Sequence, residues 1–428
     1  MRLTAVLMLL ALAASASAQT PEPVERVTFQ QAIERAALRH PTLTAATAGI
    51  LRAEGLLQQA RAATRPFATA SITTTTLNTG VEFAGSVVTP RNQIRGSLTA
   101  DLPIVAAAAW ARRTQAMDAK GIAELTVADT RRQVALAAAD AYLTIIAQRR
   151  NVEANSRARD TARAHYDLAS ELERAGSGSR LNAIRAQQEA STDDVLVESA
   201  RLALYRAQEA LGVLIVADGP VDATDEPSFD LPADAAPVAA QGGNLTTGLL
   251  QYRTDLKLFT GQVQAAERVL GDSSKDWWPS VDAIFQPAIL YPTPLFSTAR
   301  GWQFLLQADI PLFDGGQRQG ARIQRQAALD VSKATLTSAV TQASSEVRAA
   351  REAVASGERS LVSTRAAADQ AQQVVNIVNI SFRAGASTNI EVIDAERSAR
   401  DADTAVAAAE DTLRRARLDL LLALGRFP

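Results

Sequence analysis

The sequence predicts a mostly α-helical protein with a small β part, in which one structural unit is written twice. Aromatic residues make up only 5% of the 428 residues, and alanine is abundant in stretches such as 134–141, which favours long helices that approach closely. Short landmarks recur in the same order in both halves of the chain. Segments with a period of two alternate with longer segments of helical period. We therefore expect two copies of a unit that contains a strand pair and a long helical hairpin.

The N-terminal residues 1–18 resemble a cleaved secretory signal. Arg2 supplies a positive charge, residues 3–13 are apolar, and Ala16-Ser17-Ala18 forms a small-residue cleavage site. The alternative is an uncleaved anchor, but the apolar stretch is shorter than the ~20 residues that a spanning helix needs. We expect the mature chain to be exported.

Composition excludes several classes of protein. The chain has no cysteine, so it cannot be a disulfide-stabilised scaffold or carry a lipid on an N-terminal cysteine. Its 44 basic and 46 acidic residues form no long run of one sign, so we expect no nucleic-acid partner. After the signal there is no run of 18 apolar residues, so any part that spans a membrane would have to consist of strands.

The duplication is visible in four landmarks. Leu43 precedes Pro66 by 23 residues, and Leu256 precedes Pro279 by the same interval. Three further pairs follow in the same order: Asp101-Leu102-Pro103-Ile104 with Asp309-Ile310-Pro311-Leu312, Arg174-Ala175-Gly176 with Arg383-Ala384-Gly385, and Leu211-Gly212 with Leu424-Gly425. We expect a first repeat over 19–216, a Pro- and Asp-rich linker of irregular surface structure over 217–243, and a second repeat over 244–428.

Each repeat is expected to begin with a helix. In the first repeat Thr28 is a suitable N-cap with Gln31 three residues later, a spacing typical of a capping box, and an amphipathic run reaches about residue 63. Pro66 ends this run. A β-hairpin over 66–105 and a long helical hairpin over 106–212 should follow. The second repeat should hold a helix, a β-hairpin over 279–313 and a helical hairpin over 316–425.

The expected strands have one apolar and one polar face. Apolar residues alternate with polar ones over 94–104 and, with a break at Leu305, over 302–312. About ten residues per strand suits a tilted membrane strand, although a half-buried strand of a soluble sandwich shows the same alternation. Four aromatic residues near strand ends favour the membrane interpretation, as interface residues: Trp277, Trp278, Tyr291 and Trp302. Because the smallest membrane barrels have about eight strands, four strands per chain imply that several chains contribute.

The second helical hairpin carries a heptad pattern. From 316 to 382 there is no proline, and one seam places large residues opposite small ones. The large positions are Val340, Val347, Val354, Leu361, Ala368, Val375 and Phe382, and the small ones are Ala343, Ala350, Gly357, Thr364, Ala371 and Val378. Such a helix would be about 100 Å long. In the first copy Ile145, Val152 and Tyr166 hold the matching register, which Arg159 interrupts.

Over essentially the whole mature chain, this order resembles the TolC-like outer membrane efflux proteins. The motifs that carry the resemblance are Val27-Thr28-Phe29 with His40-Pro41-Thr42-Leu43, Pro66 before a strand, Asp309-Ile310-Pro311-Leu312-Phe313 with Gly315-Gly316, and Gly385 followed by Ile390-Glu391-Val392-Ile393-Asp394-Ala395. The resemblance implies a homotrimer with a transmembrane β-barrel of four strands per chain and an α-helical coiled-coil tunnel that extends from the outer membrane into the periplasm. It also implies a periplasmic adaptor and an inner-membrane pump as partners, within a tripartite efflux or type I secretion system.

By the same resemblance, the two helix–helix turns form the periplasmic tip of the tunnel. The residues expected to contact the adaptor are Arg174, Gly176, Ser177, Gly178, Arg383, Gly385, Ala386 and Ser387. The family closes this tip with an acidic ring, for which the matching positions are Glu391 and Asp394. Ser387 stands where the TolC pattern has a basic latch residue, so Arg383, Arg180 or Arg185 would have to substitute. The alternative role for Glu391 and Asp394 is that of solvated carboxylates in a first helical turn.

Two alternatives to the channel remain at this point. A periplasmic coiled-coil adaptor would normally have a single helical hairpin, and a purely structural coiled coil would not explain the alternating strands. We expect no catalytic residues, cofactor or metal site. His40 and His165 lie on different predicted helices, His165 as a coiled-coil surface residue, and neither a Gly-x-Ser-x-Gly elbow nor a phosphate-binding Gly-rich loop is present.

Overall fold

The structure is a computed structural model that describes residues 24–230 and 245–427. The expected signal peptide, 1–18, and the end of the expected linker lie outside the described residues. The chain divides into two compact units. We call them the helical unit (Met1–His40, Gln133–Leu231 and Arg351–Asp419) and the strand unit (Pro41–Arg132, Pro232–Ala350 and Leu420–Pro428).

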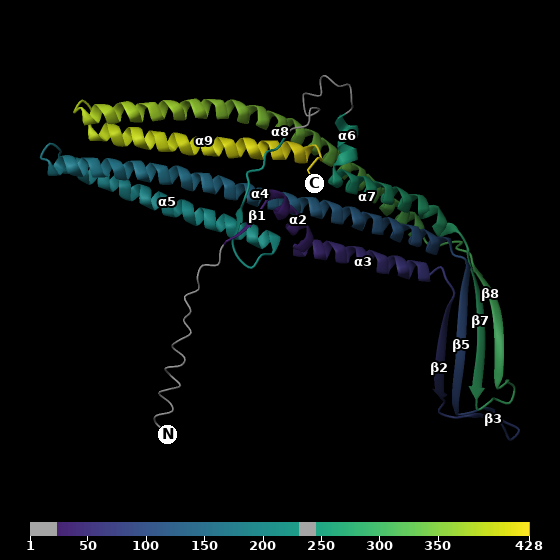
Figure 1. The fold of residues 1–428 in the computed structure, drawn as a ribbon. Helices are drawn as coiled ribbons and strands as arrows, with labels where there is room; N and C mark the ends of the chain where they lie inside the picture. Colours follow the sequence, from purple (N-terminus) through teal and green to yellow (C-terminus); the bar gives the residue numbers. More distant parts are fainter. Residues whose placement is uncertain (1–23, 231–244, 428) are drawn as a thin grey trace, which may run out of the picture. The chain divides into compact units, whose positions relative to one another are not determined.

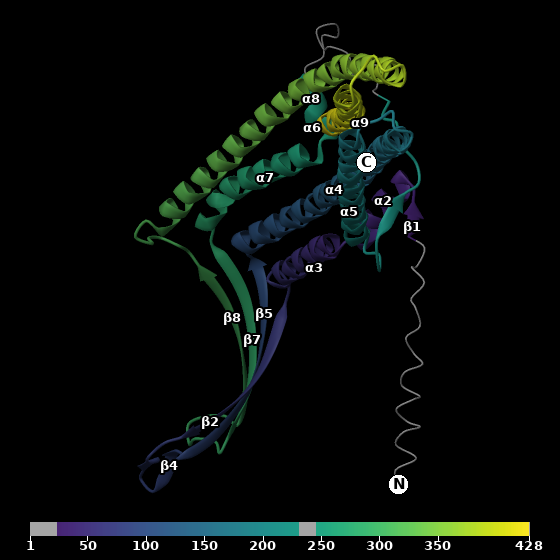
Figure 2. The ribbon, with the colours of Figure 1, turned by 90° about the vertical axis from the view of Figure 1, so that its left-hand side faces the viewer.

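The helical unit contains two long helical hairpins, drawn side by side in Figures 1 and 2. Its elements are β1 (Glu25–Val27), α2 (Phe29–Arg39), the second part of α4 (Ala107–Arg174), α5 (Arg180–Ile215), β6 (Val221–Ala223), the second part of α8 (Gln317–Arg383) and most of α9 (Asn389–Ala423). The short strands β1 and β6 pair in parallel.

The strand unit contains an antiparallel sheet in the order β2-β5-β7-β8. Its strands are β2 (Phe67–Thr76), β5 (Asn92–Val105), β7 (Ser280–Tyr291) and β8 (Arg300–Asp309), and a small hairpin of β3 (Val81–Phe83) and β4 (Ser86–Thr89) stands in the loop between β2 and β5. Its other helices are α3 (Pro41–Ala62), α6 (Leu245–Tyr252), α7 (Thr254–Gly271) and a 3-10 turn (Asp272–Trp277). The predicted class, mostly α with a small β part, is confirmed, and the order helix, strand, strand, long helix, helix occurs twice.

The first predicted helix is wrong in one respect, because it is broken at Pro41. The Thr28–Gln31 capping box opens α2 as expected. At its other end His40 is extended, with φ −64° and ψ 130°, and α3 begins at Pro41. A residue before proline is disfavoured in the α conformation, and proline is well tolerated as the first residue of a helix. The pair His40-Pro41 therefore ends one helix and starts another.

The heptad seam predicted for α8 is its buried stripe. All thirteen of these positions are buried or half-buried, with Ala343 and Val347 completely inaccessible. At Gly357, a Cβ atom would lie 3.3 Å from the Leu413 side chain of α9, so the small residues do permit close helix packing. In α4 the predicted register position Ile145 is completely inaccessible, as are Tyr142 and Leu143 beside it, and Val152 and Tyr166 are half-buried.

Part of the expected surface linker is buried structure, which corrects the prediction of an irregular surface segment. Val221 and Ala223 of β6 are almost completely inaccessible. The Tyr142 hydroxyl donates to an Asp225 carboxylate oxygen at 2.6 Å, and the Tyr142 ring meets Phe29 edge-on at 5.4 Å. Tyr142 thus fixes the segment that follows β6 against α4. None of the described helices is both long and apolar enough to cross a membrane.

Candidate functional site

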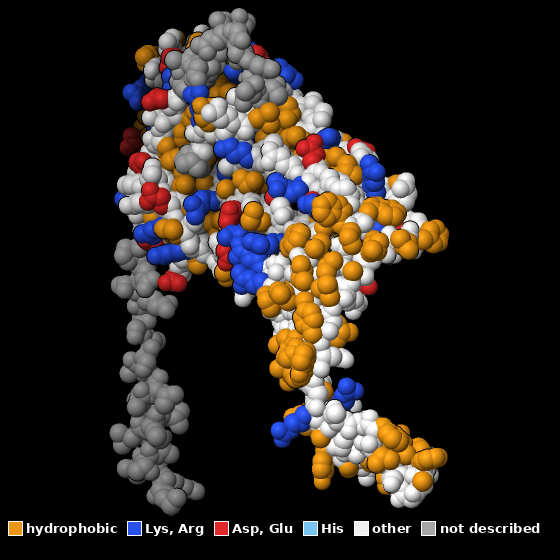
Figure 3. Space-filling model, turned by 90° about the vertical axis from the view of Figure 1, so that its right-hand side faces the viewer, with side chains coloured by type: hydrophobic (Ala, Val, Ile, Leu, Met, Phe, Trp, Pro, Cys, Tyr) orange, Lys and Arg blue, Asp and Glu red, His pale blue; other side chains and the backbone are white. Residues whose placement is uncertain are grey.

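The sheet of the strand unit has two chemically different faces. Residues paired directly across antiparallel strands share a face, and the register therefore assigns each side chain to one side. One face is apolar and carries rows of residues such as Ala70 with Leu98, Ala100 with Phe285 and Phe304, and Ala283 with Leu306. Trp302 and Phe304 on this face are 72% and 62% exposed, which is unusual for large apolar side chains. Figure 3 shows hydrophobic side chains gathered along the sheet.

The opposite face is polar and its side chains are hydrogen bonded to one another. Ser71 Oγ and Ser97 Oγ are 2.8 Å apart, and Gln286 Nε2 donates to Thr99 Oγ1 at 3.2 Å. Gln303 Nε2 donates in turn to Gln286 Oε1 at 2.6 Å. A face of hydrogen-bonding side chains is compatible with contact with water.

The four aromatic residues predicted at a membrane interface lie near the two ends of the sheet. Trp277 and Trp278 precede β7, at the end of the sheet where the helices begin, and the Arg318 guanidinium lies 5.1 Å from the Trp277 ring centroid. Tyr291 ends β7 and Trp302 lies near the start of β8, both at the other end of the sheet. All four are at least half exposed.

The helical unit ends in two turns of the same construction. Gly176 follows α4 with φ +77°, and Gly385 follows α8 with φ +75°, a left-handed conformation that glycine adopts without strain. The amide of Ser177 donates to the Leu172 carbonyl at 3.0 Å, and that of Ala386 donates to the Ser381 carbonyl at 2.8 Å. The sequence match between the turns therefore extends to their hydrogen bonds.

Glu391 lies at the second turn as part of a helix cap. Its carboxylate accepts from the Thr388 amide at 2.8 Å and from Ser387 Oγ, while the Glu391 amide donates to Thr388 Oγ1. The Ser387 hydrogen bond and the Thr388 amide lower the pKa of Glu391. Asp394 is exposed one turn later on the same helix, α9. Within one chain, Glu391 therefore acts as a cap, and its carboxylate is ionised at neutral pH.

Four arginines lie near the two turns, and three of them, Arg180, Arg185 and Arg383, are the predicted latch residues. Arg180, Arg383 and Arg174 are exposed, Arg185 is half-buried, and Arg174 donates to Ser170 Oγ at 3.1 Å on its own helix. None of these four makes an ion pair with another residue of the described parts of the chain. The structure brings Glu391 and Ser387 together, and none of these arginines is ion-paired with Glu391 in the described parts of the chain.

His165 was expected on a coiled-coil surface, and that expectation is wrong. The residue is 5% exposed, its Nε2 lies 2.8 Å from Asn389 Oδ1, and its ring packs against Phe382. Asn389 Nδ2 donates to the Asn182 carbonyl. Burial lowers the pKa of His165, although the Asn389 hydrogen bond opposes this effect, so the ring is neutral at pH 7. This contact joins the two helical hairpins directly above their turns, and sequence spacing gives no signal for it.

A buried charged cluster next to the tip is also not predicted from the sequence. Arg397 of α9 forms an ion pair with Glu189 of α5, and Arg400 forms one with Asp193 at 2.7 Å. Glu396 lies nearby with a buried oxygen, Oε2, that has no hydrogen-bond partner among the described residues. Burial, followed by repulsion from Glu189 and Asp193, raises the pKa of Glu396 to about 8.

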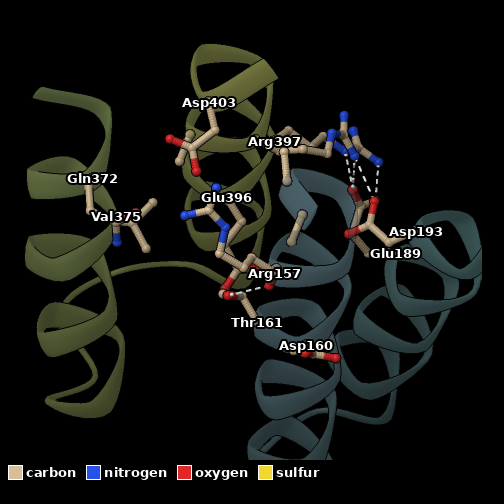
Figure 4. Close-up of a pocket in the computed structure, with 14 residues that line it drawn as sticks. Arg157, Asp160, Thr161, Glu189, Asp193, Gln372, Val375, Glu396, Arg397 and Asp403 are labelled. Carbon is tan, nitrogen blue, oxygen red and sulfur yellow. Dashed lines mark hydrogen bonds and ion pairs between the residues drawn. The ribbon is translucent and has the colours of Figure 1, made fainter. Parts of the chain in front are cut away.

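The cluster lines a cavity of about 340 Å³ between the four helices. Figure 4 shows Glu189 and Asp193 on one side of it and Gln372 and Val375 of α8 on the other. The remaining charged groups around the cavity are Arg157 and Asp160 of α4 and Asp403 of α9. Among the described residues, no group of three or more His, Cys, Asp or Glu is arranged to hold a metal ion.

The comparisons with known proteins agree with this geometry. Residues 249–426 match the family described as outer membrane efflux protein. The antibiotic efflux pump outer membrane protein ArpC of Pseudomonas putida is 24% identical over 279 residues, which is 64% of this chain and 57% of that protein. The probable efflux pump outer membrane protein TtgC of Pseudomonas putida matches to the same extent. The chain thus matches little more than half the length of these curated relatives.

Solved structures match a larger share of the chain. The outer membrane protein VceC from Vibrio cholerae superimposes with a TM-score of 0.77 at 20% identity, covering 93% of this chain and 96% of VceC. CusC, whose structures concern transmembrane channel formation, gives a TM-score of 0.82 at 16% identity, covering 93% of this chain and 92% of CusC. At these identities the matches establish the fold.

The fold is therefore that of solved outer membrane proteins such as VceC and CusC. The resemblance inferred from sequence motifs is confirmed: the chain has the fold of the TolC-like outer membrane efflux proteins, and its second half carries their outer membrane efflux protein domain. That family and that fold are those of transport proteins.

Proposed function

We propose that the chain is an outer membrane channel that serves as the exit duct of a tripartite efflux system. The observation that carries the proposal is the two-faced sheet of the strand unit, with an exposed apolar face and a hydrogen-bonded polar face. Lipid accommodates the apolar face, and a water-filled lumen accommodates the polar one. The aromatic side chains at the two ends of the sheet support this orientation, because tryptophan and tyrosine favour the membrane interface.

A homotrimer would complete the membrane part. The outer strands β2 and β8 each pair on one side only within the described chain. Unpaired strand edges are not tolerated in lipid, so the edge of β8 would pair with β2 of a neighbouring copy. With four strands per chain, three copies would give a closed barrel of about twelve strands, within the range of known membrane barrels.

The helical unit would extend into the periplasm and end in the two glycine turns. The proposal assigns the residues of both turns to the contact with a periplasmic adaptor, through which an inner-membrane pump would supply the energy. In a trimer the exposed carboxylates of Glu391 and Asp394 would form an acidic ring at the tip. Like charges so close together raise cation affinity.

Efflux is favoured over protein secretion because the relatives are efflux components. ArpC is named for antibiotics, and a second TtgC, from another strain of Pseudomonas putida, is named for toluene. We extend to this chain only the general class, small toxic organic compounds. The adaptor alternative is set aside because the matched proteins are outer membrane efflux proteins. In this role the chain catalyses no reaction and needs no cofactor.

Outer-membrane fractionation followed by native mass spectrometry of the detergent-extracted protein tests the proposal. We expect the protein in the outer-membrane fraction with the mass of three chains. A soluble monomer would contradict both the membrane location and the assembly. A deletion strain, grown on a panel of organic toxins and metal salts, would identify the cargo.

A further inference from the structure

A hollow of about 840 Å³ lies on the polar face of the sheet, at the end away from the helices. Its floor is formed by side chains of β2, β5, β7 and β8, including Thr73, Ser97 and Gln303. Its other side is formed by Phe296, Ser297 and Thr298 in the loop that joins β7 to β8. The hollow therefore combines a hydrogen-bonding floor with an aromatic group.

The loop over 292–299 is held across this polar face. The Leu290 amide donates to the Ala299 carbonyl at 2.9 Å, and the Ser297 amide donates to the Pro294 carbonyl at 3.1 Å, which closes a turn. Gly301 shares the polar face with Ala288, its partner across the strands. A Cβ atom at Gly301 would point toward Thr298 and lie 3.4 Å from its Oγ1, so the loop approaches this face and not the apolar one.

Arg95 places a positive charge in the hollow. It pairs with Thr73 on β2 and with Leu290 on β7, both of which also line the hollow. Arg95 makes no ion pair with any residue in the described ranges. Asp101, the nearest carboxylate along β5 on this face, is six residues away, or roughly 20 Å at 3.3 Å per residue. That separation exceeds the Debye length of about 8 Å at physiological ionic strength, so Asp101 does not neutralise Arg95.

We propose that this hollow binds organic anions that carry an apolar group, with Arg95 holding the carboxylate or sulfonate and Phe296 covering the apolar part. Phe296 is 80% exposed, so its ring is available for such contact. The hydroxyls of Thr73 and Ser97 and the amide of Gln303 offer further donors on the floor. The proposal rests on the channel function above, because it takes the polar face as the wall of the lumen. Passing anions would then be selected at the outer mouth of the duct.

The test measures block of single-channel current by 2-naphthalenesulfonate in planar bilayers. Arg95→Gln should weaken the block roughly tenfold, as expected for the loss of a charge-assisted hydrogen bond. Phe296→Ala should weaken it by a smaller factor. The matched control is Arg300→Gln. Arg300 pairs with Ile289 on the apolar face, and Arg95 pairs with the next residue of β7, Leu290, so the two arginines lie at nearly the same position along the strands. That variant should be blocked like the wild type, and block by the 2-naphthylmethylammonium cation should not weaken in Arg95→Gln.

Equal block of Arg95→Gln and Arg300→Gln would overturn the inference while leaving the channel intact. If neither the wild type nor a variant with Glu391 and Asp394 replaced by alanine carries current, the channel function itself fails. Equilibrium dialysis of 2-naphthalenesulfonate against the protein in lipid nanodiscs then decides the inference. Weaker binding by Arg95→Gln than by Arg300→Gln would support the site. Equal binding by the two variants would refute it.

Discussion

Glu396 is a carboxyl group that burial keeps protonated near neutral pH. Its pKa is raised to about 8, whereas a glutamate in an unfolded chain titrates near 4.3. The folded state therefore holds a proton that the unfolded state releases. The resulting stabilisation is fully present below about pH 4 and is lost as the pH rises toward 8, by at most ~1.4 kcal/mol per pH unit.

Glu396→Gln should remove this pH dependence, because the amide stays neutral at every pH. We expect the apparent Tm of the variant to exceed that of the wild type, by a margin that grows from pH 5 to pH 8 and then becomes constant. Thermal unfolding in detergent across this range measures it. Glu391→Gln is the control: its carboxylate has a lowered pKa and is ionised throughout, so its difference from the wild type should not change with pH. A constant margin for Glu396→Gln would contradict the buried cluster.

At the scale of single elements, the seam of α8 makes a quantitative prediction. Val347 is completely inaccessible, whereas Val362 of the same helix is 71% exposed. Truncating a buried valine removes two methyl groups and leaves a cavity, which costs about 2 kcal/mol. Val347→Ala should therefore lower the apparent Tm, and Val362→Ala should leave it nearly unchanged. Equal effects of the two substitutions would argue against a buried seam.

The two faces of β8 make a second prediction. Leu306 lies on the apolar face with Ala283, and Gln303 lies on the polar face with Gln286. An arginine that faces lipid costs roughly 2–4 kcal/mol at the membrane midplane, whereas one in the lumen is solvated. Leu306→Arg should strongly reduce the amount of assembled protein in the outer membrane, and Gln303→Arg should not. Quantitative blots of membrane fractions measure the amount of assembled protein. A loss with Gln303→Arg and not with Leu306→Arg would mean that the polar face, and not the apolar one, contacts lipid.

The sequence predicted elements whose signal is periodic. Alternation located β5 and β8, and the heptads of α8 located its buried stripe, because both patterns repeat over ten residues or more. The break at Pro41 was missed because the predicted helix was continued through a proline, which disfavours the α conformation of the residue before it. The order of strands in the sheet was not predictable either: β5 pairs with β7 across the two repeats, and alternation does not indicate which strands are neighbours.

The candidate sites likewise include residues that the sequence predicts and contacts that it does not predict. The order of short motifs located Glu391 and the turns at Gly176 and Gly385, because the residues within each motif are close in sequence. The contacts of His165 with Asn389 and of Arg397 with Glu189 join residues more than 200 positions apart. Such contacts arise from the packing of two hairpins. Nothing in the spacing of a histidine or a glutamate on a helix specifies its partner on another hairpin.

At the scale of the whole molecule, the acidic tip is a prediction about three chains. Replacing both Glu391 and Asp394 with alanine would remove six carboxylates from a trimer. The variant should show weaker block by divalent cations in planar bilayers, because the ring concentrates cations at the entrance, or a higher closed-state conductance, because the acidic ring that closes the tip is gone. Ser387→Ala is a useful control, since it removes a hydrogen bond to Glu391 and leaves the charge. No change in conductance or in block for the double variant would leave Glu391 with its capping role alone.

The most direct test of the central claim is the conductance of the purified wild-type protein in a planar lipid bilayer. A channel with a polar lumen should give discrete, uniform current steps, and the steps should respond to divalent cations added on the side of the helical tips. We predict such steps from preparations whose native mass is that of three chains. A correctly assembled, membrane-inserted protein that carries no current under any condition, including with the tip acids removed, would contradict the account.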